Sequence, residues 1–144
     1  MNRAGFWSIA IVLFWAGFVS SISFMEAWLK FQAPGVTLPV GLSIGKMIFN
    51  ALNRVEWFLL IGYSVLFFGF IKNKSRVINT VSLVLLGTLI VQTFFLLPRL
   101  SERADIIING GEVGKSFLHI YFGSLEIVKV AGLLYLGYLF YRRR

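Results

Sequence analysis

Two glutamates, Glu56 and Glu126, each lie within a long apolar stretch of the sequence. A charged side chain near the centre of a bilayer costs at least about 2.5–3.5 kcal/mol, so such residues normally face other helices and find partners there. Asn53 precedes Glu56 by three residues and therefore shares its helix face. His119 precedes Glu126 by seven residues, which also places both on one face. This spacing predicts a polar cleft between two helices, in which the glutamates carry a proton or a cation.

Further polar side chains accompany this pair. Glu26 ends the first apolar stretch, and Arg99 and Arg103 follow the third, so all three are expected at the mouth of the cleft. A structural role is the alternative, because Arg54 or Lys129 can neutralise the glutamates and hold helices together without a ligand. The full set of predicted ligand-binding residues is Glu26, Asn50, Asn53, Arg54, Glu56, Arg99, Arg103, His119, Glu126 and Lys129.

A metal site is a second and more specific alternative to the binding cleft. Side chains of the kind that iron, zinc or manganese accept occur at four positions, namely His119, Glu126, Glu56 and Glu26. The spacing speaks against a di-iron bundle, because the sequence has neither an H-E-x-x-H nor an E-x-x-H pair and holds a single histidine. A divalent metal ion is therefore an alternative cofactor, and the sequence assigns no other.

The chain that carries these residues is too apolar for a water-soluble domain. Of its 144 residues, 58% are apolar and only 14% are charged, whereas roughly 25% are charged in soluble proteins. The length corresponds to a single domain, residues 1–144. We expect an all-α integral membrane protein, a bundle of four transmembrane helices with spans at residues 5–28, 47–71, 77–98 and 116–141.

Prolines are expected to separate these spans. Pro34 and Pro39 block a continuous helix and predict a long loop at residues 29–45. Pro98 is expected to end the third span, leaving a second long loop at residues 99–115, whose first residues can extend the helix. Both long loops then lie on the same side of the membrane.

Charge distribution predicts the orientation. Four crossings put both termini on one side, and that side carries seven basic and no acidic residues: Arg3, Lys72, Lys74, Arg76, Arg142, Arg143 and Arg144. Five basic residues on the other side are balanced by three acidic ones. The positive-inside rule therefore makes both termini cytoplasmic, and we expect a multi-pass protein of the bacterial inner (plasma) membrane. These basic clusters mark topology, so no nucleic-acid partner is expected.

A weak internal similarity leaves two versions of the bundle open. Gly45 and Lys46 precede Glu56 much as Gly114 and Lys115 precede Glu126, at an offset of 69 to 70 residues. Membrane proteins are often built from duplicated halves. The fold is therefore either a plain bundle or two tandem helix-loop-helix repeats.

The segment Ala51–Gly62 resembles a known signature. It reads A-L-N-R-V-E, followed by F and I-G, and is similar to the second helix of the membrane-associated eicosanoid and glutathione metabolism family, whose members are basic four-helix chains. The resemblance implies glutathione or lipid conjugation at Asn53 and Glu56. Asn50 stands where that family usually has an arginine. The general layout is equally similar to small bacterial four-helix membrane families, from which no activity follows.

The leading hypothesis is a small polytopic membrane protein whose outward-facing polar cleft binds or transports a small polar solute or ion. A membrane enzyme acting on a lipid-soluble substrate, either metal-dependent or glutathione-linked, is the second hypothesis, and enzymatic activity stays open. A structural or accessory membrane subunit is the third. The expected partners are the lipid bilayer and the solute, and the bundle either forms homo-oligomers or is surrounded by lipid.

Overall fold

The computed structural model describes residues 3–70 and 75–142, and all of its regular elements are helical. The first rod consists of α1 (Arg3–Ser20), the π-helical η1 (Ser21–Glu26), α2 (Ala27–Leu29) and the 3₁₀ turn η2 (Lys30–Gln32). The second rod is α3 (Leu38–Phe70). The third consists of α4 (Arg76–Val91), the π-helical η3 (Gln92–Leu96) and α5 (Leu97–Ile108), and the fourth is α6 (Leu118–Arg142).

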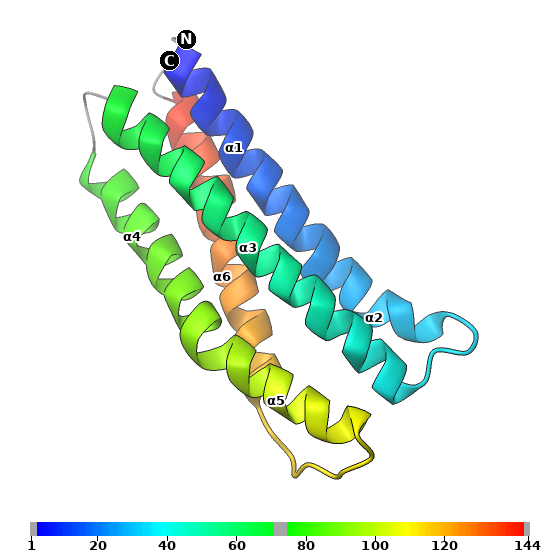
Figure 1. Cartoon of the computed structure of the whole chain (residues 1–144). Coiled ribbons are helices and arrows are strands. Elements are labelled where there is room, and N and C mark those ends of the chain that lie inside the picture. Colours follow the sequence, from blue (N-terminus) through cyan, green and yellow to red (C-terminus); the bar gives the residue numbers. More distant parts are fainter. Residues whose placement is uncertain (1–2, 71–74, 143–144) are drawn as a thin grey trace.

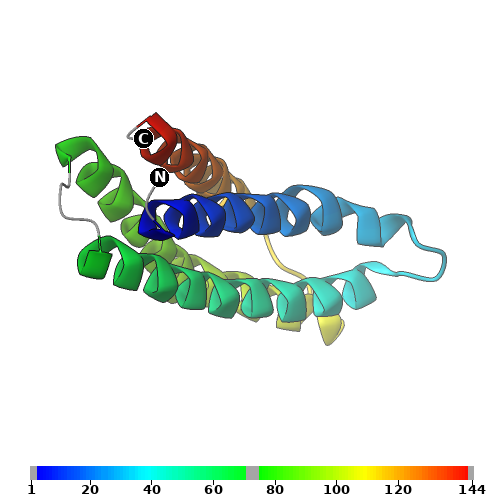
Figure 2. The ribbon, with the colours of Figure 1, turned by 90° about the horizontal axis from the view of Figure 1, so that it is seen from above.

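Each of the four rods is long and apolar enough to span a membrane, with candidate spans of 30 residues in the first, 32 (Leu38–Gly69) in the second, 33 in the third and 25 in the fourth. The predicted all-α architecture with four candidate spans is confirmed to that extent. Figure 1 shows both termini at one end of the bundle. The connections at residues 33–37 and 109–117 lie at the opposite end, here called the loop end (Figures 1 and 2). Lys72, Lys74, Arg143 and Arg144, which contribute to the predicted orientation, lie outside the described residues.

Two helices extend well beyond the predicted spans. α3 begins at Leu38 and not at residue 47, with Pro39 in its first turn, where the missing N–H leaves no helical hydrogen bond unmade. Pro98 does not end the third rod, which continues through α5. The π-helical η3 directly precedes it and widens the helix where the proline ring would otherwise meet the carbonyl of Phe94. Both predicted loops were therefore too long.

The two halves of the chain differ where the internal similarity was strongest. Lys46 lies inside α3, whereas Lys115 lies in the connection before α6. The helix starts therefore lend no support to a tandem repeat.

The interior of the bundle is apolar toward the termini. α1 packs closely on α6 at Gly137, where an added Cβ would lie 3.2 Å from the side chain of Leu13. A hydrogen bond of 2.7 Å between the hydroxyls of Tyr63 and Ser82 joins α3 to α4. The fully or nearly fully buried apolar side chains include Val12, Trp15, Val19, Leu52, Ile78, Leu85, Leu89, Leu133 and Leu136.

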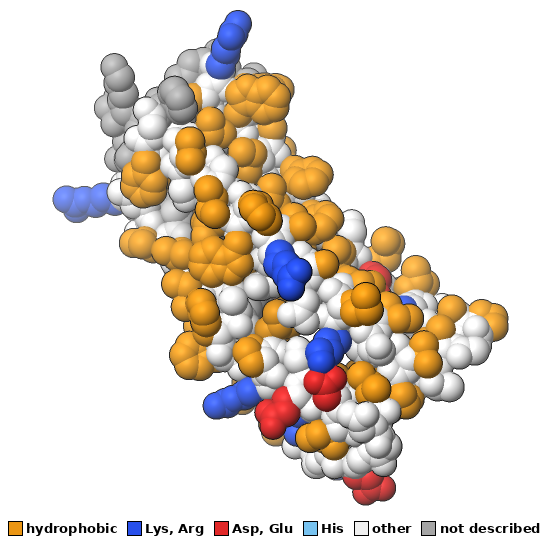
Figure 3. Space-filling model, viewed as in Figure 1, with side chains coloured by type: hydrophobic (Ala, Val, Ile, Leu, Met, Phe, Trp, Pro, Cys, Tyr) orange, Lys and Arg blue, Asp and Glu red, His pale blue; other side chains and the backbone are white. Residues whose placement is uncertain are grey.

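The outer surface separates apolar from charged regions. Apolar side chains cover most of the face seen in Figure 3; the acidic side chains in view lie toward the loop end, whereas basic ones occur along the whole length. Large apolar residues such as Phe14, Phe58 and Phe68 are more than half exposed. An exposed apolar surface of this extent is typical of helices that contact lipid or other proteins.

Candidate solute-binding site

Two carboxylates and one ammonium group are buried together between the helices. Lys129 Nζ lies 2.6 Å from Glu56 Oε1 and 3.0 Å from Glu126 Oε1. None of the three side chains is more than 2% exposed. This Glu56–Lys129–Glu126 cluster joins α3 to α6.

Neutral donors complete the cluster from the other two rods. Trp15 Nε1 donates to Glu56 Oε1 at 3.0 Å. Gln92 Nε2 donates to Glu126 Oε1 at 2.6 Å, and Ser23 Oγ donates to Glu126 Oε2 at 3.1 Å. All four rods therefore contribute to one polar network. The amide carbonyl of Gln92 is buried and accepts no hydrogen bond from the described residues.

Local helix geometry explains how these side chains meet. Glu126 and Lys129 are three residues apart and so share one face of α6. Ser23 lies in η1 and Gln92 lies in η3, the two π-helical segments of the described chain. A π-helical turn is wider than an α-helical one and is often found at functional sites. Both segments here present a hydrogen-bond donor to the same carboxylate.

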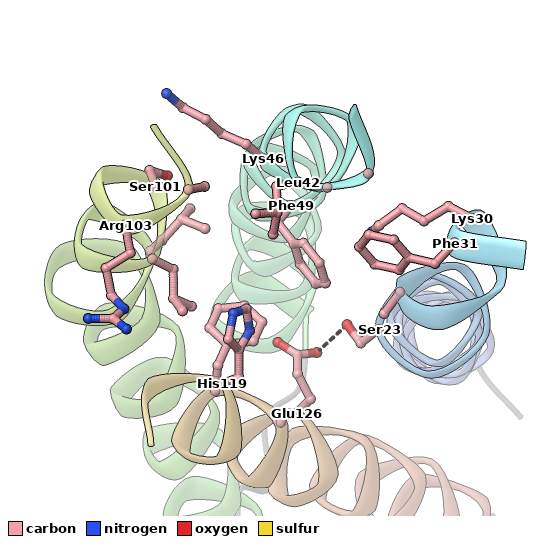
Figure 4. A pocket seen from close by; sticks show the side chains of 18 residues that line it. Ser23, Lys30, Phe31, Leu42, Lys46, Phe49, Ser101, Arg103, His119 and Glu126 are labelled. Carbon is pink, nitrogen blue, oxygen red and sulfur yellow. Dashed lines mark hydrogen bonds between the residues drawn. The ribbon is translucent and has the colours of Figure 1, made fainter. Parts of the chain in front are cut away.

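A pocket runs from this network toward the loop end. Its volume is about 230 Å³, and residues of all four rods line it: Ser23, Ala27, Lys30, Phe31, Gly41, Leu42, Gly45, Lys46, Phe49, Leu97, Leu100, Ser101, Arg103, Ala104, His119, Phe122, Gly123 and Glu126. In Figure 4 the rings of Phe31, Phe49 and His119 surround the hollow, and Glu126 lies at its base with Ser23. We call this space the loop-end pocket.

One wall of the loop-end pocket depends on two glycines of α3. A Cβ at Gly41 would lie 2.0 Å from the ring of Phe31, so the ring packs directly on the helix backbone there. A Cβ at Gly45 would lie 2.9 Å from Lys30 Nζ. The end of the first rod can therefore close on α3 because Gly41 lacks a side chain, whereas a Cβ at Gly45 would meet only the flexible end of Lys30. Lys30 is held in addition by Glu26, at 3.2 Å.

Polar contacts tie the opposite wall together. Lys46 Nζ donates to both carboxylate oxygens of Asp105, at 2.7 and 2.6 Å, and so joins α3 to α5. The guanidinium of Arg103 donates to the carbonyl of Gly114 in the last connection. Lys46 turns away from the hollow in Figure 4. These contacts shape the pocket, and the charges of Lys30 and Lys46 are both balanced by carboxylates.

The structure brings together only part of the predicted ligand-binding set. Glu56, Glu126 and Lys129 form the buried cluster, and Arg103 and His119 line the loop-end pocket above Glu126. The remaining five residues do not line the pocket: Glu26, Asn50, Asn53, Arg54 and Arg99.

Those five residues have other surroundings. Glu26 forms an ion pair with Lys30, and Arg99 is exposed on α5. Asn50 donates to the backbone carbonyl of Lys46 at 2.7 Å. Arg54 was predicted to neutralise a glutamate, but it is exposed and forms no ion pair with any described carboxylate. Its offset of two residues from Glu56 turns it to another face of α3.

Asn53 and Glu56 are on the same side of α3 but form hydrogen bonds with different neighbours. Asn53 Nδ2 donates to the hydroxyl of Thr93 at 2.9 Å, and the indole of Trp57 donates to the same hydroxyl at 3.0 Å. Glu56 points instead into the buried cluster. The two residues on which a conjugation activity would depend are therefore not turned toward one space.

Of the four predicted metal ligands, only Glu56 and Glu126 are brought together, and Lys129 lies between them. Within residues 3–70 and 75–142, no three histidine or carboxylate side chains lie close enough to hold a metal ion. Gly41–Gly45 has the G-x-S-x-G spacing found in serine hydrolases, but it lies inside α3 and not at a strand-to-helix turn. Neither arrangement points to a catalytic centre.

Sequence reasoning missed the neutral donors and the aromatic wall. Gln92 is one of only two strongly polar side chains in its span, which was a usable signal for a buried partner. Ser23 belongs to a row of small residues at helical spacing that was expected to face the other helices, whereas Trp15 gave no signal, because indoles are common in apolar helices. Lys30 and Phe31 fell in a segment predicted to be a loop.

Comparisons of the chain with family models, with curated proteins and with solved structures find no match. Arguments about function therefore depend on the site itself.

Proposed function

We propose that this chain is a multi-pass membrane protein that binds a small polar solute in the loop-end pocket and transports it together with a proton or a cation. The Glu56–Lys129–Glu126 cluster is the charged centre of this activity. Ser23 and His119 orient the solute between that centre and the mouth of the pocket.

The lengths of the rods support a membrane setting with a projecting loop end. At about 1.5 Å per residue, rods of 25 to 33 residues are about 37 to 50 Å long, whereas the hydrocarbon core of a bilayer is about 30 Å thick. The part nearest the termini has the apolar surface, so the loop end projects from the bilayer. The pocket then opens to water and reaches down to Glu126 at the edge of the apolar region.

The charge balance of the cluster is the observation that carries the proposal. Two carboxylates share a single ammonium group, so the fully ionised cluster has a net charge of minus one. An unbalanced buried charge is strongly unfavourable. A proton or a bound cation removes it, and the pocket gives such a species a path to Glu126. The unpaired carbonyl of Gln92 offers one more acceptor beside Glu126.

The experiment measures thermal stability of the purified full chain against a panel of small amino acids, carboxylates, amines, sugars and inorganic cations. We expect at least one class to stabilise the wild type and to lose its effect in Glu126→Gln. Glu102→Gln is the matched control, because Glu102 is exposed on α5. A response to no class, or equal responses in wild type and Glu126→Gln, contradicts the proposal.

The orientation is proposed with both termini cytoplasmic and the loop end outside the cell. The chain has no cysteine, so a single introduced cysteine is the only thiol that a maleimide can label. We expect Ala33→Cys in intact cells to react with a membrane-impermeant maleimide, and Ser75→Cys to react only after lysis. The reverse labelling pattern contradicts this orientation.

A structural role is the second candidate, favoured by the fact that the cluster connects all four rods. In that case the charges specify assembly and the pocket has no ligand. The two candidates differ in one respect: a structural cluster predicts that Glu126→Gln changes stability without changing the response to any solute.

A further inference from the structure

The loop-end pocket has two polar levels. Ser23 and Glu126 are hydrogen bonded at the base. Seven residues toward the loop end along each antiparallel rod lie Lys30 and His119, which both line the pocket. Seven residues correspond to two helical turns, or about 10 Å. Lys30 and His119 therefore lie on either side of the pocket at one level, about 10 Å from the level of Glu126.

The outer level offers hydrogen-bond donors. The side chain of Lys30 is only 9% exposed, and its ammonium group has three hydrogens. It donates one hydrogen bond, to Glu26, and lies 5.5 and 5.6 Å from the ring centres of Phe31 and Phe49. An ammonium group this buried and with a single acceptor can donate further hydrogen bonds to an anion in the pocket.

The inner level has the opposite character. Glu126 belongs to the cluster that holds one more carboxylate than ammonium, and among the described residues its Oε2 receives only the neutral hydroxyl of Ser23. Between the two levels, the rings of Phe49 and Phe122 meet edge to face with centres 5.4 Å apart. Aromatic walls suit an alkyl chain and also attract a cation.

We infer that the loop-end pocket takes a small zwitterion, with its carboxylate at Lys30 and His119 and its ammonium group at Glu126. This inference rests on the proposed function, and it names the class of solute. The backbone levels of the two sites are about 10 Å apart, and the Lys30 side chain reaches back toward the base to Glu26, so the charged groups of the ligand are separated by a short alkyl chain. A spacer of three carbons meets that requirement. The volume of about 230 Å³ equals that of roughly eight waters at about 30 Å³ each, which is enough for such a molecule.

The test compares three probes of equal chain length on the purified full chain by calorimetric titration. γ-Aminobutyrate has both charged groups, butylamine lacks the carboxylate, and butyrate lacks the ammonium group. We expect γ-aminobutyrate to bind at least about tenfold more tightly than either of the others, because each charge-assisted hydrogen bond that is lost weakens binding by about that factor. This comparison uses the wild type alone and so does not depend on how a variant folds.

Two variants with matched controls assign the ends of the ligand. Lys30→Gln is expected to bind γ-aminobutyrate no better than butylamine, and Glu126→Gln is expected to bind it no better than butyrate. Lys115→Gln and Glu112→Gln are the controls, because both residues are exposed in the last connection. They are expected to keep the wild-type preference.

The results of these experiments distinguish a failure of the zwitterion inference from a failure of the proposed solute-binding function. Equal binding of γ-aminobutyrate and butylamine, absence of binding by all three probes, or a preference for butyrate each overturns the zwitterion. If another solute class in the stability panel still depends on Glu126, the proposed function stands without it. If no class does, both fail together.

Discussion

Replacing Lys129 with methionine removes the only ammonium group of the buried cluster. The substitution keeps an unbranched side chain of similar length, so packing around its stem changes little. Glu56 and Glu126 each lose a charge-assisted hydrogen bond, of 2.6 and 3.0 Å respectively. At about 1.5–3 kcal/mol for each such bond, the free energy of unfolding should fall by about 3–6 kcal/mol. Breaking a buried ion pair by removing one partner costs about 3–5 kcal/mol, which agrees.

The assay is reversible unfolding of the detergent-solubilised chain in sodium dodecyl sulfate, followed by tryptophan fluorescence. Lys115→Met is the control, because Lys115 is exposed in the last connection and a surface substitution changes stability by less than about 0.5 kcal/mol. The triple variant Glu56→Gln, Lys129→Met, Glu126→Gln should regain most of the loss, since no uncompensated charge remains.

Two results would refute this reasoning. If Lys129→Met loses less than about 1 kcal/mol, the ammonium group does not hold the cluster together, since one lost bond alone should cost more. If the triple variant is no more stable than the single variant, the penalty arises from lost packing and not from buried charge. A triple variant that is stable but no longer responds to any solute separates the proposed transport function from the structural candidate.

Two further substitutions test individual contacts. Trp15→Phe keeps a buried ring but removes the indole N–H that lies 3.0 Å from Glu56 Oε1, so the free energy of unfolding in the same assay should fall by about 1.5–3 kcal/mol. An unchanged stability would mean that this bond is not formed. Gly41→Ala places a methyl group 2.0 Å from the ring of Phe31 and should lower the thermal midpoint, whereas Gly87→Ala meets no atom within 4 Å and should raise it or leave it unchanged. Equal midpoints for the two variants would show that the glycine contact is not needed.

Side-chain chemistry allowed the centre of the site to be predicted, because the cost of burying a charge applies wherever the helices pack. Glu56 and Glu126 lie in apolar stretches, and each needs a partner there. Lys129 was one of two candidates, and helix periodicity decides between them. It shares a face with Glu126, three residues away, whereas Arg54 is two residues from Glu56 and turns to the surface.

The walls of the pocket could not be predicted, because a proline signal was interpreted too strongly. Pro39 and Pro98 were expected to mark loops, yet each lies within a helical rod. A proline is tolerated in a first helical turn and after a widened one, and only the surrounding structure shows which case applies. As a result Lys30, Lys46 and Phe31 were assigned to a loop or its edge, although they form walls of the pocket.

The π-helical segments change the helix periodicity from which buried faces are predicted. An α-helix repeats every 3.6 residues, so each residue inserted by a π-helical turn rotates everything after it by about 100°. Lys30 follows Val19 by eleven residues, which an uninterrupted α-helix places within about 20° of Val19, so periodicity already turns Lys30 toward the interior, where it lines the pocket. Such a rotation at η3 separates Gln92 from the pattern of α5. Both π-helical segments lie where the rods pass Glu126, the level of the bundle at which Ser23 and Gln92 donate their hydrogen bonds.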